Sequence, residues 1–151
     1  MAIDAKLTQF NNLKSSIKHL RVPEAAQAPI LECIKLALAS QASPSLVSAG
    51  FSTLGHFVKR LHLQDQTGII VAQANKLFPV LLDRLGDARE SHRNAASLSL
   101  SDLWAICHAE VERTVREGAL TGTNARAKEI GMRWVVKVRR STCPLSNHTL
   151  T

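Results

Sequence analysis

The sequence predicts an all-α fold, and three observations support this prediction. Almost every segment places apolar residues at helical spacing, and no segment sustains the alternation of a strand. Short polar turns separate these segments. A similar helix start also recurs 35 to 45 residues apart, at Lys6, Ser48, Arg93 and Lys128. Because HEAT repeats have a period of about 40 to 47 residues, we predict a HEAT-repeat α-solenoid of about three and a half repeats.

The first three helices are predicted from their apolar stripes and their boundaries. A helix over residues 4–19 ends before Pro23, because proline disfavours helix at the residue that precedes it. A second helix begins at Glu24 and ends before residue 40. Ser43 is expected to cap a third helix, with Pro44 at its first position and its end near Leu61. The first helix has one apolar stripe, formed by Leu7, Phe10, Leu13 and Ile17, and the second helix carries the apolar residues Ile30, Leu31, Ile34, Leu36 and Leu38.

The second half of the chain repeats this organisation. A helix over residues 69–85 is expected, with a kink or an irregular early part caused by Pro79, and Gly86 ends it. Asp87 is expected to cap a helix that continues to about residue 106. A short helix over residues 109–119 and a polar turn follow. Asn124 is then expected to cap a last helix over residues 125–138. The inward-facing residues expected here are Ala95, Ala96, Leu100 and Leu103.

Composition narrows the class of protein. A chain of 151 residues with 45% hydrophobic content fits one globular domain, and a net charge of +7 favours an acidic macromolecular partner. The three cysteines lie far apart without a CxxC pair, which argues against a disulfide framework or a zinc site and indicates a reducing compartment. No apolar run reaches the roughly 20 residues of a membrane span. Asp4 and Lys6 interrupt the amino terminus too early for a signal peptide. We therefore expect a cytosolic or nuclear protein with no membrane partner.

Three stretches carry a more specific resemblance. They are "LVSAGFSTLGHFVKRL" (residues 46–61), "KLFPVLLDRLGDARESHRNAA" (residues 76–96) and "NARAKEIGMRWV" (residues 124–135). Over residues 4–138 the chain resembles the first TOG domain of fungal CLASP-type microtubule-associated proteins. The resemblance implies a paddle of HEAT repeats whose intra-repeat turns line one narrow edge, and that edge contacts the strongly acidic tubulin dimer. We thus expect a partial TOG-like domain over residues 1–138 and a polar, flexible tail over residues 139–151.

The resemblance also implies which residues form the binding edge. Carried over residue by residue, this set comprises Asp4, Lys6, Pro44, Ser45, Ser48, Asp87, Arg89, Arg93, Asn124, Arg126 and Lys128. The family often places a tryptophan in the first turn. Here the two tryptophans, Trp104 and Trp134, lie late in helices, where packing between repeats is expected. Cations on rigid helix starts can meet an acidic surface without ordering a loop, which lowers the entropic cost of association.

The sequence offers no catalytic or cofactor site. No HExxH pair or phosphate-binding GxxxxGK loop is present, and the acids Glu110 and Glu112 lie two apart on a helix and do not converge. We expect no enzyme activity, no metal and no cofactor. Nucleic acid is disfavoured as a partner, because the chain has no tyrosine and only 4% aromatic residues with which to stack bases.

The expected function is therefore tubulin or microtubule binding in the cytoskeleton and the mitotic spindle, including a nuclear spindle in closed mitosis. The alternative is a HEAT-repeat adaptor that binds kinetochore, cortical or other microtubule-associated proteins without contacting tubulin directly. Under that alternative the basic edge is an ordinary solvated helix face.

Overall fold

The structure is a computed structural model that describes the backbone of residues 3–149 and the side chains of residues 3–118 and 120–138. Over the described residues it contains seven α-helices and one π-helix and no strand. In chain order these are α1 (Ile3–His19), α2 (Glu24–Leu38), α3 (Pro44–Leu63), α4 (Gly68–Ala72), α5 (Ala74–Leu85), α6 (Glu90–Thr114), η1 (Val115–Leu120, the π-helix) and α7 (Ala125–Thr149). The predicted all-α fold is confirmed.

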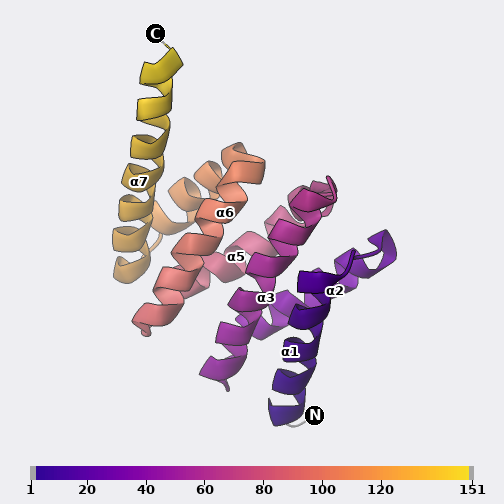
Figure 1. Cartoon of the computed structure of the whole chain (residues 1–151). Coiled ribbons are helices and arrows are strands. Elements are labelled where there is room, and N and C mark those ends of the chain that lie inside the picture. The colour runs from indigo at the N-terminus through magenta and orange to yellow at the C-terminus, as the bar shows by residue number, and fades with distance from the viewer. Residues whose placement is uncertain (1–2, 150–151) are drawn as a thin grey trace.

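The helices form two layers, as a HEAT solenoid requires. In one layer α1 packs against α3, α3 against α6, and α6 against α7; these four helices lie side by side in Figure 1. In the other layer α2 packs against α5, and α5 against η1. Each repeat is a pair drawn from both layers, α2 with α3 and α5 with α6. The predicted HEAT-type organisation is therefore confirmed.

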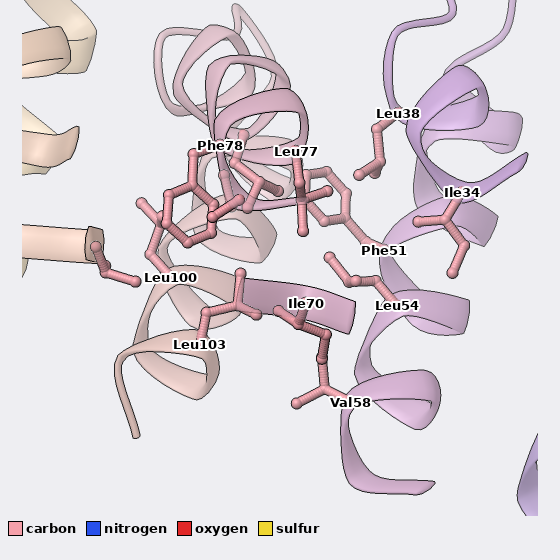
Figure 2. Close-up of a cluster of buried hydrophobic side chains, with 14 of the residues drawn as sticks. Ile34, Leu38, Phe51, Leu54, Val58, Ile70, Leu77, Phe78, Leu100 and Leu103 are labelled. Carbon is pink, nitrogen blue, oxygen red and sulfur yellow. The ribbon is translucent and has the colours of Figure 1, made fainter. Parts of the chain in front are cut away.

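The hydrophobic core fills the space between the two layers. Figure 2 shows Leu54 from α3, Ile70 from α4, Leu77 from α5 and Leu100 from α6 pointing into one cluster. All four side chains are at most 1% exposed. Burial of a Leu or Ile side chain contributes about 1.5 to 3 kcal/mol, so this shared cluster holds successive repeats in a fixed relation.

Most of the apolar residues named from the sequence are buried or half-buried, but Leu36 is 63% exposed. Ile34 and Leu38, four residues apart, share the buried face of α2. A residue two positions from each of them lies on the opposite side of the helix.

The two tryptophans were expected to pack between repeats. Trp134 is 1% exposed and donates to Ser101 across α6 and α7, while Trp104 is half-buried.

Several helix boundaries differ from the sequence prediction. The helix expected over residues 69–85 is broken at Gln73 into α4 and α5. Pro79 lies inside α5, which continues through it, so the break is at Gln73 and not at the proline. The break expected after residue 106 occurs at Cys107, whose φ of −141° and ψ of 61° are not helical. The part of α6 that follows Cys107 does not end as a separate short helix but continues into η1.

The last helix was predicted to end near Val138, and this boundary was wrong, since α7 continues to Thr149. Between Gly131 and Pro144 the sequence contains no glycine or proline that would stop a helix. The side chains of the predicted tail, residues 139–151, lie outside the described side chains, and the division at residue 138 stays a prediction. None of the described helices combines the length and hydropathy needed to cross a membrane.

Candidate functional site

The starts of α1, α3, α6 and α7 lie on the same side of the molecule, at the lower edge in Figure 1. Three turns precede the last three of these helices: residues 39–43, 86–89 and 121–124. Contacts link each turn to the next. Arg84 donates to the carbonyls of Leu38 and Ser40 at 2.6 Å each, and Asn124 lies directly against Gly86. We call this surface the turn edge.

The turn over residues 86–89 is built around the carboxylate of Asp87. Its Oδ2 accepts from Arg84 at 2.6 Å and lies 3.2 Å from Nδ1 of His92, and its Oδ1 accepts from the backbone N–H of Arg89 at 2.7 Å. Arg93 donates to the carbonyls of Asp87 and Ala88. Asp87 was expected to cap α6, but Arg89 occupies the cap position and α6 begins at Glu90. The three donors to its carboxylate fix Asp87 two residues before the cap.

The charge of Asp87 is stabilised by these contacts. Burial alone raises the pKa of the carboxyl group, but the hydrogen bonds from the Arg89 backbone, from Arg84 and from His92, with the charge of His92, outweigh burial and lower the pKa to about 2. Asp87 is therefore ionised at neutral pH, and its carboxylate is used in hydrogen bonds that hold the turn. The side chain of Arg84, which is 12% exposed, is used in the same way, because it donates to Asp87 and to two carbonyls of the preceding repeat.

His92 extends this network to α3. Its Nε2 lies 3.4 Å from Oγ of Ser48, and its ring packs against Phe51 with the centroids 6.5 Å apart. Ser48, His92 and Asp87 thus follow the order of a hydrolase triad. The arrangement lacks what acyl transfer needs, because the backbone N–H groups around Ser48 are used within α3 and do not form an oxyanion site. The three side chains instead tie α3, α6 and the turn together.

The turn over residues 121–124 is held more simply. Asn124 Oδ1 accepts from the backbone N–H of Ala127 at 3.0 Å, which confirms Asn124 as the cap of α7. Ser43 is confirmed as the cap of α3 by its bond from the Leu46 N–H at 3.1 Å. A Cβ placed on Gly86 would lie 2.4 Å from the Asn124 side chain, so glycine is needed for the close approach of these two turns.

The comparisons with known proteins agree with this architecture. The model of the family described as CLASP N terminal matches residues 1–149. The chain belongs to this family. It is 54% identical over 139 residues to "Protein STU1" of Phaeosphaeria nodorum, covering 92% of this chain and 11% of that protein. It is 46% identical over 140 residues to "Protein STU1" of Coccidioides immitis, covering 93% and 11%, respectively.

A more distant relative is "Protein STU1" of Debaryomyces hansenii, which is 28% identical over 133 residues, covering 87% of this chain and 9% of that protein. The chain spans about a tenth of the length of these CLASP-family relatives. No solved structure matches it. The resemblance to the amino-terminal part of fungal CLASP-type proteins is confirmed.

Within this CLASP-family domain, the predicted edge residues fall into two groups. Asp87, Arg93, Asn124 and Ser48 make hydrogen bonds that hold the turns or join α3 to α6. The others have exposed side chains at or next to helix starts: Asp4, Lys6, Pro44, Ser45, Arg89, Arg126 and Lys128. Sequence reasoning did not find Arg84 and His92, because the contacts by which they join successive repeats are to residues 44 to 46 positions away. Among the described residues, no group of three or more His, Cys, Asp or Glu side chains could hold a metal ion.

Proposed function

We propose that this chain is a non-enzymatic tubulin- or microtubule-binding module of a CLASP-type protein, which acts on microtubule dynamics at the cytoskeleton and the mitotic spindle. The proposed binding surface is the turn edge. The chain covers only part of its relatives, so we further propose that other domains of a longer protein add valency to this contact.

One observation carries the proposal. Four exposed cations, Lys6, Arg89, Arg126 and Lys128, lie at the starts of three helices that share one edge. The amino-terminal end of a helix carries partial positive charge, and a cation there opposes the helix dipole by about 0.3 to 1 kcal/mol. These positions do not serve helix stability. The four cations outnumber the exposed acids Asp4 and Glu90 at the same helix starts, so together with the dipoles they give the edge a positive field. An acidic surface such as that of tubulin complements this field.

The rigidity of the edge supports the same proposal. The turn over residues 86–89 is fixed by the Asp87 network, and the turn over residues 121–124 is packed against it through Gly86 and Asn124. A partner that binds to such a surface does not have to order a loop, so little conformational entropy is lost on association.

Sedimentation of the chain with purified αβ-tubulin tests this function. The informative variant is Arg89→Glu with Arg126→Glu. Glutamate near a helix start is favourable for the helix dipole, so this variant reverses charge without weakening the fold. Lys76→Glu on α5, in the other layer, is a charge-reversal control outside the turn edge, to be compared with each single reversal as well as with the double variant. Analytical ultracentrifugation at low salt is expected to give a complex for the wild type and the control, and none for the double variant.

Salt dependence gives a second readout in the same experiment, because contacts between exposed charges weaken as ionic strength rises. If the folded wild-type chain leaves tubulin sedimenting alone, direct tubulin binding by this chain is wrong, and the adaptor alternative takes its place. If the complex forms equally with the double variant, the turn edge is not the binding surface.

A further inference from the structure

A groove lies between α3 and α6, and its lining extends from Ser48 and His92 near the turn edge to Lys59 and Asp102 farther along the two helices. Its volume is about 360 Å³, and its lining includes Ser52, Gly55, His56 and Lys59 from α3 with Ala95 and Leu98 from α6. We call it the α3–α6 groove. The four exposed cations on which the tubulin proposal rests do not line this groove, so the function of the groove is a separate question.

Gly55 is the residue in this groove whose presence needs explanation. A Cβ added to Gly55 would meet no atom within 4 Å. Gly50, one and a half turns earlier in α3, is different, because a Cβ there would lie 3.1 Å from Cβ of Ala37 on α2. Glycine inside a helix costs about 1 kcal/mol relative to alanine. Close packing against α2 explains why position 50 is a glycine. No such packing is present at Gly55, where the missing side chain leaves open space in the groove.

Apolar side chains border that open space. Leu98, on the α6 side, is 58% exposed, while Phe51, on the α3 side, is 7% exposed. An apolar group that entered over Gly55 would remove apolar surface of Leu98 from water, at roughly 25 cal/mol per Å². The groove can therefore bind one apolar side chain in the open space over Gly55, which we call the apolar seat.

The neighbouring surface is basic. His56 and Lys59 on α3 line the groove, and Lys14 and Lys18 lie on α1, which packs against α3. Burial first, and then the charges of Lys18, Lys59 and Lys14, lower the pKa of His56, which places these groups within electrostatic reach of one another. None of the three lysines forms an ion pair with a described carboxylate.

Acidic groups are scarce on this side of the molecule. Helix α3 contains no Asp or Glu, and Asp4 is the one acid of α1, at the far end from Lys14 and Lys18. Asp102 of α6 is the acidic residue in the lining of the groove. The α1 and α3 side of the groove thus presents positive charge beside an apolar seat.

We propose that the α3–α6 groove binds an acidic peptide segment of a partner protein, with one apolar side chain seated over Gly55 and carboxylates facing Lys59, Lys14 and Lys18. The apolar seat favours a peptide over a nucleic acid, because a phosphate backbone would use the lysines alone. Binding here does not depend on tubulin, since none of the four exposed cations of the turn edge lines the groove.

Fluorescence anisotropy with a labelled twelve-residue peptide of glutamates around one central leucine tests the proposal. The wild-type chain is expected to bind this probe, and Gly55→Leu, which fills the groove, is expected to weaken binding about tenfold or more. Leucine has a higher helix propensity than glycine, so this variant keeps the fold. Gly55→Ala, which leaves most of the space, is the matched control and is expected to bind within about twofold of the wild type.

The charge contribution is tested with Lys14→Glu and Lys59→Glu together, for which we again expect a loss of about tenfold or more, against Lys76→Glu as the control on the other layer. A probe with glutamine in place of glutamate should not bind. The proposal is overturned if folded wild-type chain fails to bind at about 1 mM probe, or if Gly55→Leu binds as the wild type does. It is also overturned if single-stranded DNA displaces the peptide and binds Gly55→Leu and the wild type equally, because the groove would then be a nonspecific polyanion surface.

Discussion

Two turns of the same edge are constructed in different ways. The turn over residues 86–89 uses the carboxylate of Asp87 to join Arg84, His92 and the Arg89 backbone. The turn over residues 121–124 uses one side-chain cap bond, from Ala127 to Asn124, and the packing of Asn124 against Gly86. The first is a nearly buried ionic network, and the second is a local cap.

Because the turns are held in these ways, basic residues that look equivalent in the sequence have different functions in the structure. Arg84 and Arg93 donate to backbone carbonyls and are part of the fold. Arg89, between them, uses its backbone N–H in the turn and leaves its side chain exposed. Arg126 and Lys128, in the first turn of α7, also have exposed side chains. A basic residue on this edge is thus either a structural donor or a free charge, and its contacts decide which.

The largest expected effect is the loss of the Arg84 side chain. Arg84→Met leaves the Asp87 carboxylate and the carbonyls of Leu38 and Ser40 without their donor, and breaking a buried pair in this way costs about 3 kcal/mol or more. Urea unfolding followed by circular dichroism measures it. The matched control is Arg133→Met, which removes an ion pair of the same 2.6 Å length whose arginine is 71% exposed, and should cost less than about 0.5 kcal/mol. Equal losses would contradict the distinction between structural and exposed cations.

A somewhat smaller effect is expected from Asp87→Asn. The lowering of the Asp87 pKa from 3.8 to about 2 corresponds to about 2 kcal/mol, because each pKa unit equals about 1.4 kcal/mol. Since the folded-state pKa is the lower one, this stability is fully present above about pH 4 and is lost as the pH falls toward about 2. The wild type should therefore exceed the variant at pH 7, and the two should converge near pH 2. A gap in stability that does not depend on pH would show that the carboxylate charge is not responsible.

Gly86→Ala tests the contact between the two turns. The new methyl group would force the Asn124 side chain from its place, at a cost of about 1 kcal/mol, the usual value of a helix cap. Serine at position 124 is a shorter cap, so Gly86→Ala should cost less in an Asn124→Ser background, and a double-mutant cycle measures this coupling. Gly55→Ala, where the space is open, should instead stabilise the chain by about 1 kcal/mol. Additive effects at Gly86 and Asn124 would rule out the packing of one turn on the other.

Local rules predicted the parts of this molecule that depend on neighbouring residues. The caps at Ser43 and Asn124 follow from side chains that reach a backbone N–H three residues ahead. The Arg84 network was not predictable in this way, since its carbonyl partners belong to the preceding repeat. The cap expected at Asp87 failed for a different reason, because the nearby donors Arg84, His92 and the Arg89 backbone N–H occupy its carboxylate. Exposure of Leu36 could have been predicted from its position in the helical period.

Charge reversal at the exposed cations should have the smallest effect on stability. Arg89→Glu and Arg126→Glu are each expected to change the free energy of unfolding by less than about 0.5 kcal/mol, because both side chains are exposed and glutamate suits a helix start. Arg93→Glu should be different, since it removes two hydrogen bonds to the carbonyls of Asp87 and Ala88. Urea midpoints of the three variants compare these effects directly.

The most direct test of the account is the tubulin affinity of Arg89→Glu, measured beside its urea midpoint. Arg89 lies in the network-held turn but leaves its charge free, so the account predicts weaker tubulin binding with an unchanged midpoint. Wild-type affinity in this variant, or a loss of affinity that occurs only together with a lower midpoint, would contradict the assignment of Arg89 as a binding cation.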